Sequence, residues 1–210
     1  MRRLWLLAAT LLALWGGWSW WQARPLHPPP GVLAPDDPLQ TPLDGSMEPI
    51  RVGDFTLLPR ARFDLTARVL STEHYRLDAG AALVPEDFAL GWGRMSDSAV
   101  LKQIDITQSA RFYYWSVRRF PIPRREIETH SANMHLIPAD AGVRRALERT
   151  RVGQLLALDG YLVDADRADG WHWRTSLSRD DTGDGACELF YVTSVAAPSG
   201  QGTPSPSAPP

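Results

Sequence analysis

Short stretches of the chain alternate apolar with polar residues, a pattern that predicts strands with one buried face. The clearest runs from Phe63 to Val69, where an apolar residue occupies every second position. An aromatic, β-rich run predicts another strand at 110–117. Further strands are expected at 154–163, 171–177 and 187–195. Gly160 interrupts the first of these, so a bulge or bend is expected there.

Two short helices are predicted where a capping aspartate precedes apolar residues at helical spacing. Asp97 caps the first, which continues to Ile104, and Asp140 caps the second, which continues to about Arg149. Five or six strands with one or two short helices predict a mainly β domain of the α+β class. We interpret it as a small, partly open barrel, with an OB-like arrangement as the first hypothesis.

The N-terminal segment is apolar without alternation. Residues 4–21 carry no charge and are mostly Leu, Ala and Trp. A helix of this length spans about 27 Å, close to the hydrocarbon thickness of a bilayer. Arg2 and Arg3 precede it, which places the N-terminus in the cytoplasm by the positive-inside rule. Residues 1–21 are therefore predicted to be a single-pass anchor in the inner (plasma) membrane, with the rest of the chain periplasmic.

A cleavable signal peptide shares this charge and this apolar core. Cleavage requires small residues at its site, whereas the apolar run ends in the bulky Trp18, Trp20 and Trp21. An uncleaved anchor is therefore the preferred interpretation. Under either interpretation the domain that follows is exported.

Composition divides the remainder of the chain into three parts. Prolines dominate residues 22–52, which predicts an extended linker with no packed core and a reach of up to about 90 Å. Residues 53–195 carry the strand and helix patterns and form the predicted extracytoplasmic domain. The Ser, Gly and Pro of residues 196–210 predict a disordered tail.

Charge and cysteine content exclude several classes of protein. The formal net charge is -2, so no broad basic field is present to hold nucleic acid. Cys187 is the only cysteine, so no intrachain disulfide can form. No cofactor-binding motif is complete, and no cofactor is expected.

The segment Ser46-Met47-Glu48-Pro49, followed by Gly53-Asp54, resembles the nucleophile segment of type I signal peptidases. In that family a serine is activated by a lysine that burial keeps neutral. The resemblance implies a Ser46/Lys102 dyad in an enzyme that acts outside the membrane, because Lys102 is the only lysine. The sequence that surrounds the lysine in that family is absent here, as is its Gly-Asp-Asn-Arg segment. The alternative is a turn in the linker and a solvent-exposed lysine.

The loop at 180–185 half resembles a calcium-binding loop, in which carboxylates at alternate positions precede a glycine. Asp180 and Asp184 fit this pattern, and Glu188 would complete a looser calcium site. Tyr191 stands where an EF-hand has its bidentate glutamate, so an EF-hand is excluded. The alternative is a polar hairpin loop.

A zinc site is a third hypothesis, with ligands drawn from His130, His135, His172 and Cys187. No two of them have the close spacing of familiar zinc ligands. The alternative is that His130 and Asn133 form hydrogen bonds within an irregular segment before the second helix.

Aromatic residues and arginines concentrate at 113–125 and at 171–174. On an OB-like sheet such residues could stack on rings, although about half of them are expected in the core. The proline-flanked run 118–125 is predicted to be an exposed loop that contacts a partner or lipid headgroups.

Three further segments are distinctive: Leu-Gly-Trp-Gly-Arg-Met-Ser-Asp at 90–97, His-Ser-Ala-Asn-Met-His-Leu-Ile-Pro at 130–138 and Ser-Arg-Asp-Asp-Thr-Gly-Asp-Gly-Ala-Cys-Glu at 178–188. Together they resemble segments of a family of uncharacterised bacterial membrane-anchored proteins. The resemblance covers about residues 55–195. It implies that these residues form one unit and implies no activity.

We therefore expect a non-catalytic, membrane-tethered module that binds another envelope protein or a small envelope ligand. The three segments are expected to converge on its site. The candidate binding residues are Trp92, His130, Asn133, His135, Arg179, Asp180, Asp181 and Glu188. The rival hypothesis is an enzyme, either the Ser46/Lys102 peptidase or a hydrolase that uses Asp180, Asp181 or His130.

Overall fold

The computed structural model describes residues 24–45, 47–178 and 187–198, together with four residues near the N-terminus, Trp5, Thr10, Gly16 and Gly17. Within these described residues no helix is both long enough and apolar enough to cross a membrane. The predicted anchor lies outside the described part of the chain, apart from those four residues, and so does most of the predicted tail.

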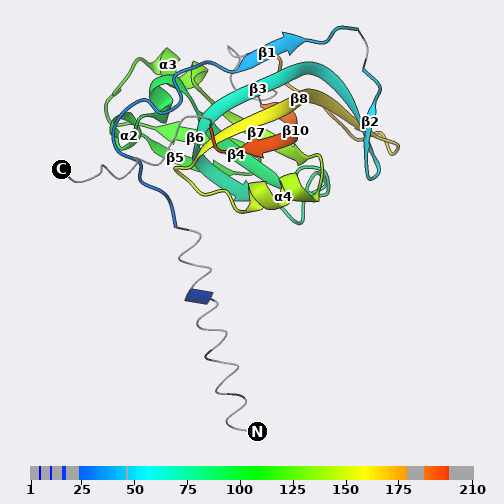
Figure 1. The fold of residues 1–210 in the computed structure, drawn as a ribbon, viewed down its shortest axis with the longest axis horizontal. Coiled ribbons are helices and arrows are strands. Elements are labelled where there is room, and N and C mark those ends of the chain that lie inside the picture. Colours follow the sequence, from blue (N-terminus) through cyan, green and yellow to red (C-terminus); the bar gives the residue numbers. More distant parts are fainter. Residues whose placement is uncertain are drawn as a thin grey trace, which may run out of the picture.

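Ten strands and four short helices make up the described fold (Figure 1). The strands are β1 (Leu39–Pro42), β2 (Ile50–Val52), β3 (Phe55–His74), β4 (Glu86–Gly91), β5 (Asp105–Ser109), β6 (Phe112–Ser116), β7 (Ser131–Pro138), β8 (Leu155–Arg167), β9 (His172–Trp173) and β10 (Glu188–Ala196). The helices are the 3-10 helix η1 (Gly93–Ser96), α2 (Ser98–Leu101), α3 (Arg124–Thr129) and α4 (Ala141–Glu148).

The main sheet closes on itself because β3 is long enough to pair with two different strands. Its first part pairs with β8 and its second part with β4. β4 then pairs with β7, β7 with β10, and β10 with β8, which completes the circuit (Figure 1). Of these pairs only β7–β10 is parallel. The prediction of a mainly β fold built as a small barrel is confirmed at this level.

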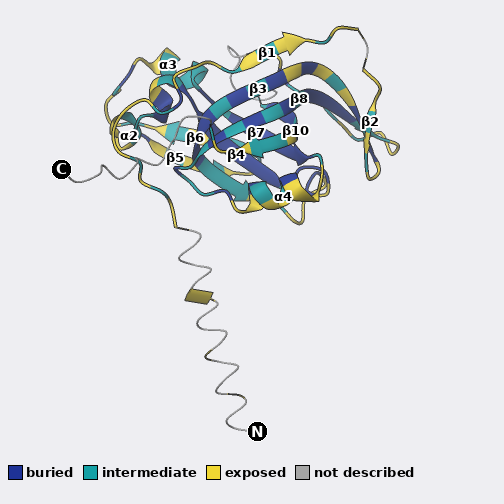
Figure 2. Cartoon of the chain, viewed as in Figure 1, coloured by how far each residue is buried: buried dark blue, intermediate teal, exposed yellow. Residues whose placement is uncertain are grey.

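The core of the barrel follows from the alternation in β3. Phe63, Leu65 and Ala67 point inward, and the Phe63 ring meets that of Phe190 edge to face, with the ring centroids 5.2 Å apart. In Figure 2 dark blue buried residues accordingly interrupt teal and yellow ones along β3. Helix α4 closes one end of the barrel with its buried Leu147.

Both predicted helix caps are confirmed. The Asp97 carboxylate accepts a hydrogen bond from the Ala99 amide at the start of α2, although α2 ends earlier than predicted. Asp140 accepts from the amides of Gly142 and Val143 at the start of α4. Each aspartate satisfies amides that the first turn of a helix leaves without partners.

Gly160 is required by a close approach rather than by a bulge in its own strand. A Cβ atom there would lie 2.0 Å from the Tyr191 carbonyl oxygen. The irregular pairing occurs on the facing strand, between Val192 and Ser194 of β10. The predicted irregularity is present, therefore, but the extra residue belongs to the partner strand.

The segment predicted to be a linker without packed contacts, 22–52, is packed on the barrel over its described part. β1 and β2 both pair with β3. Ala34 is fully buried in the core, and the Ser96 hydroxyl accepts hydrogen bonds from the amides of Leu33 and Ala34. The linker prediction is corrected: residues 24–45, here called the N-terminal strap, belong to the folded unit, and the boundary at 53 is too late.

An insertion between β4 and β7 carries the β5–β6 hairpin and α3 (Figure 1). Its apolar residues form a separate cluster that includes Met95, Ile122 and Ile127. The segment before α4, expected to be irregular, is β7, and its neighbours in the sheet are β4 and β10. The insertion covers the polar positions of β7 and creates the site described next.

Candidate ligand-binding cavity

A cavity of about 620 Å³ lies between the β5–β6 hairpin, α3, and the first residues of β7 and β10. Its described lining is largely aromatic on the hairpin side and polar on the barrel side. The lining residues are Trp92, Phe112, Tyr113, Tyr114, Trp115, Val117, Phe120, Arg124, Glu128, Thr129, Ser131, Ala132, Asn133, Ser178, Cys187 and Glu188. This volume falls within the range of small-ligand sites.

The aromatic side of the cavity is built by β6 and the loop after it. Trp115 meets Phe120 edge to face at 6.2 Å, and the Arg124 guanidinium lies 5.7 Å from the Trp115 ring. Tyr114 and Phe120 are each about half exposed, so apolar rings reach the mouth of the cavity. Arg124 is itself held by Glu128 one turn along α3.

The barrel side offers hydrogen-bonding groups. The hydroxyls of Tyr113 and Ser131 are 2.7 Å apart, and Ser131 also donates to the Ile127 carbonyl. Burial raises the pKa of Tyr113 to about 12, so this hydroxyl stays neutral at physiological pH. The indole nitrogen of Trp92 is buried and has no hydrogen-bond partner among the described residues.

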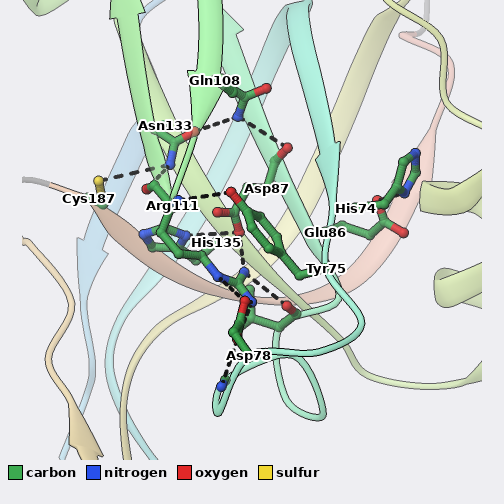
Figure 3. Close-up of polar contacts among 12 residues, drawn as sticks. His74, Tyr75, Asp78, Glu86, Asp87, Gln108, Arg111, Asn133, His135 and Cys187 are labelled. Atoms are coloured by element: carbon green, nitrogen blue, oxygen red, sulfur yellow. Dashed lines mark hydrogen bonds and ion pairs between the residues drawn. The ribbon is translucent and has the colours of Figure 1, made fainter.

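Asn133 stands between the cavity and a second polar group beneath the hairpin. Its side-chain oxygen accepts from Gln108 at 2.6 Å, and its nitrogen donates to the Arg111 carbonyl at 2.9 Å. The same nitrogen lies 4.0 Å from the Cys187 sulfur (Figure 3). The hairpin is therefore fastened to β7 through side chains rather than through strand pairing.

Arg111, at the tip of the hairpin, is the centre of the second polar group (Figure 3). Its guanidinium pairs with Asp78 and with the buried Asp87, each at 2.8 Å, and lies 3.6 Å from the centre of the Tyr75 ring. Burial works against ionisation of Asp78, but the hydrogen bonds and charge of Arg111 outweigh it and lower the pKa of Asp78 below its usual value. A broader, more open hollow of about 920 Å³ borders this group.

The hairpin tip adopts a strained backbone to place this guanidinium. Ala110 and Arg111 have φ values of 51° and 72°, in the left-handed region that two-residue hairpins usually fill with Asn and Gly. Such conformations cost of order 1 kcal/mol or more per residue and persist only where the surroundings enforce them. The two carboxylates that hold Arg111 supply that constraint.

His135 lies in the same group and is buried. Its Nδ1 is 2.9 Å from Asp87, and its ring packs against Trp173 at an inclined angle of 52°, with the ring centroids 4.4 Å apart. It lies beneath the hairpin, on the strand that also carries Asn133. His135 therefore links β7 to β4 and β9, beside the Asp87 carboxylate that holds Arg111.

The structure brings three of the eight candidate binding residues into one cavity: Trp92, Asn133 and Glu188. They come from the three segments expected to converge. His135 lies behind Asn133, as described above. His130 packs against Gly93, where a Cβ would lie 2.6 Å from its ring, and its Nε2 is 3.6 Å from Asp37 of the strap.

The other candidates lie outside the described residues. These are Ser46 of the predicted dyad, and Arg179, Asp180, Asp181 and Asp184 of the predicted loop. Ser178 and Cys187, which flank that loop, both line the cavity. Lys102 is described and is exposed at the end of α2. The peptidase hypothesis requires this amine to be buried.

No three His, Cys, Asp or Glu side chains in the described part of the chain are close enough to hold a metal ion. His172 is exposed on β9, whereas His135 is buried beneath the hairpin. Cys187 is half-buried at the edge of the cavity.

Sequence reasoning missed Asp87, Gln108 and Arg111. Asp87 immediately precedes the apolar run Phe88–Leu90, and a charged residue beside a buried strand is a detectable signal. Arg111 gave no such signal, because the sequence of the turn, Ala110-Arg111, lacks the residues that usually mark a tight hairpin.

Comparison with protein-family models, with curated proteins and with solved structures finds no match. The resemblance of the three segments to membrane-anchored proteins therefore stays a prediction.

Proposed function

We propose that this chain is a membrane-tethered, non-catalytic module of the cell envelope, which binds an extended segment of another envelope protein in the cavity beside β6. One observation carries the proposal: an edge of β6 that no other strand of the described residues pairs with borders an aromatic cavity. The tether supports it indirectly, because a module confined to a shell near the membrane meets membrane partners at a raised effective concentration.

The free edge follows from the strand register. Ala110 and Arg111 form a two-residue turn, so Phe112, Tyr114 and Ser116 are the residues of β6 whose backbone groups face β5. Tyr113 and Trp115 direct their backbone N–H and C=O groups away from β5. Among the described residues β6 pairs with β5 alone, and no other backbone group bonds to Tyr113 or Trp115.

An unpaired strand edge of this kind is a template for a further strand from a partner. Backbone hydrogen bonds then provide affinity, and pockets for alternate side chains provide specificity. Here the cavity would accept an aromatic or large aliphatic side chain against Trp115 and Phe120, the type of anchor that dominates binding energy at interfaces.

We also propose that the barrel is of the OB type. Its circuit runs β3–β4–β7–β10–β8. Counted along the chain, the third barrel strand, β7, is parallel to the fifth, β10, and α4 lies between the third and the fourth, β8. OB barrels bind ligands on the face of their second and third strands. In this chain the Gln108 and Arg111 contacts cover that face with the hairpin, which moves the open site to β6.

The proposal is tested by placing the photoreactive residue p-benzoylphenylalanine at Tyr114 in the full-length protein in its native membrane. We expect one polypeptide adduct from Tyr114 and none from Leu39, which is also exposed, lies on β1 and is not among the residues that line the cavity. A synthetic peptide covering the adduct site should then slow hydrogen exchange at the amides of Tyr113 and Trp115.

Two controls separate this function from its rivals. Ser46→Ala should leave the adduct unchanged, because the proposed site does not use that residue. Tyr114→Ala should weaken binding of the peptide, and Leu39→Ala should not. An adduct with no protein component, or a peptide that leaves both amides unprotected, would contradict strand addition at β6.

A further inference from the structure

A basic surface lies on α4 and on the loop that joins it to β8. Residues 141–153 contain four arginines and one acidic residue, Glu148. The arginines are Arg144, Arg145, Arg149 and Arg151. No ion pair to any of them is found among the described residues. Their positive charge is therefore available to an external anionic partner.

The packing of α4 explains why this charge faces outward. The helix buries Val143 and Leu147 to close the end of the barrel. Residues between them on the helix must then project away from the core. Arg145 and Arg149 are exposed, and Arg144 and Arg151 are partly exposed.

The N-terminal strap enters the folded unit at this surface. The Leu26 amide donates to the Val152 carbonyl at 2.7 Å. A Cβ at Gly153 would lie 2.0 Å from the Leu26 carbonyl oxygen, so the two backbones are in direct contact. In Figure 1 the blue start of the strap leaves the lower side of the domain, to the left of α4 and nearer to α2 and β5.

This contact limits how far the basic surface can be from the membrane. The predicted anchor ends at Trp21, five residues before Leu26. Five fully extended residues span at most about 18 Å. The reach of about 90 Å expected for a free linker is therefore replaced by a short connection, because the strap is bound to the barrel from Leu26 onward.

We propose that α4 and the loop 149–153 form the membrane-facing surface of the domain and bind the phosphate headgroups of anionic lipids. Arginine suits this partner because its planar guanidinium can donate two parallel hydrogen bonds to a phosphate. Basic residues close to a bilayer are attracted to its anionic lipids within about a Debye length of the surface. The inference rests on the anchor in the proposed function and is independent of the cavity and its ligand.

The test uses the full-length protein with Cys187→Ser, in vesicles of phosphatidylcholine with and without phosphatidylglycerol. A nitroxide is attached at Ala141→Cys on α4 or, as a control, at Leu39→Cys on β1, both of which are exposed. Collisions with a nickel-chelating lipid report proximity to the headgroups. We expect at least threefold more collisions at residue 141 than at residue 39 in vesicles that contain phosphatidylglycerol.

Charge reversal then tests the arginines themselves. Arg145→Glu with Arg149→Glu should reduce the collisions at residue 141 at least twofold. Arg118→Glu with Arg119→Glu, exposed arginines that precede α3 at another edge of the domain, should not. Equal collisions at residues 141 and 39, or no effect of the α4 reversal, would overturn the inference.

Retention of the chain is read in the same samples. Release of the protein from the vesicles by an alkaline wash would also overturn the inference. The protein would then lack a membrane anchor, and nothing would hold Leu26 close to the bilayer. That outcome is distinguishable from failure of the cavity, which is read separately from the photoadduct at Tyr114. An alkaline-resistant chain with equal collisions at the two labels would remove the membrane-facing surface while leaving the tether in place.

Discussion

At the scale of single residues, Arg111 joins the inserted hairpin to two carboxylates, and one of these, Asp87, is completely buried. Arg111→Met keeps much of the apolar stem and removes the charge, which leaves Asp87 without its guanidinium. Removing one partner of a buried pair typically costs about 3–5 kcal/mol. We expect a loss of about 3 kcal/mol in the free energy of unfolding, measured by urea denaturation.

The exposed pair Arg62–Asp64 provides the comparison for this substitution. Arg62→Met should change stability little, because exposed ion pairs contribute little. Arg111→Met combined with Asp87→Asn should cost less than the sum of the two single changes, since the double variant leaves no uncompensated charge. A cost for Arg111→Met no larger than that for Arg62→Met would show that the hairpin does not depend on this residue.

His74 gives a pH-dependent prediction. A hydrogen bond that His74 Nδ1 donates to the Glu86 carboxylate, 2.5 Å away, raises the pKa of His74 above 6.5, and burial opposes this only in part. The folded state therefore holds the proton more tightly than the unfolded state. The stability that this pair contributes is fully present below pH 6.5 and is lost as the pH rises through the higher folded-state pKa.

The comparison of wild type with His74→Gln isolates this contribution. The difference in unfolding free energy should be largest below pH 6.5 and should shrink steadily toward pH 9. Denaturant titrations at intervals of half a pH unit would measure it. A difference that stays constant over this range would mean that His74 acts by packing rather than by charge.

At the scale of elements, one hydroxyl fastens the middle of the strap at Leu33 and Ala34. Ser96 accepts from the amides of Leu33 and Ala34 and donates to the Gly93 carbonyl. Ser96→Ala would leave two inward-facing amides without an acceptor, at a cost of about 2 kcal/mol. Local opening of residues 31–37 should become about 30-fold more frequent, as measured by amide hydrogen exchange. Ser116→Ala, on the exposed side of β6, should leave this exchange unchanged.

Elements that depend on local signals could be predicted from the sequence. Asp97 and Asp140 were identified as caps because the residues that a cap serves lie two or three positions away. The alternation from Phe63 to Val69 similarly reports burial within a single strand. These predictions hold because the physical cause lies inside the segment that was read.

Elements that depend on distant partners could not be predicted. The polar residues Asn133 and His135 predict an irregular segment where the structure has β7. The strand tolerates them because their partners, Gln108, Arg111 and Asp87, come from other elements. Proline content predicts a free linker for the strap. The strap packs on the barrel instead because Ser96, about sixty residues away in the sequence, accepts hydrogen bonds from its amides. The candidate site shows the same limit. The three segments that contribute to the cavity could be predicted from the sequence, but the position of the β5–β6 hairpin opposite them could not.

At the scale of the whole molecule, the packed strap changes where the folded unit begins. A chain that begins at residue 53, the boundary expected from composition, would lose β1, β2 and the buried Ala34. It would also lose the hydrogen bonds from Leu26 and Leu33, of the kind that contribute about 1 kcal/mol each before the entropy of ordering the strap is subtracted.

We expect the chain that begins at residue 53 to be less stable than one that begins at residue 24 by roughly 2–4 kcal/mol. Thermal and urea unfolding of the two chains would measure this difference, and a chain 24–198 serves as the control for removal of the C-terminal residues. Equal stability of the chains that begin at residues 24 and 53 would mean that the strap lies on the barrel without stabilising it. The short connection between the anchor and α4 would then fail as well, because a strap that contributes nothing could detach and restore the long reach of a free linker.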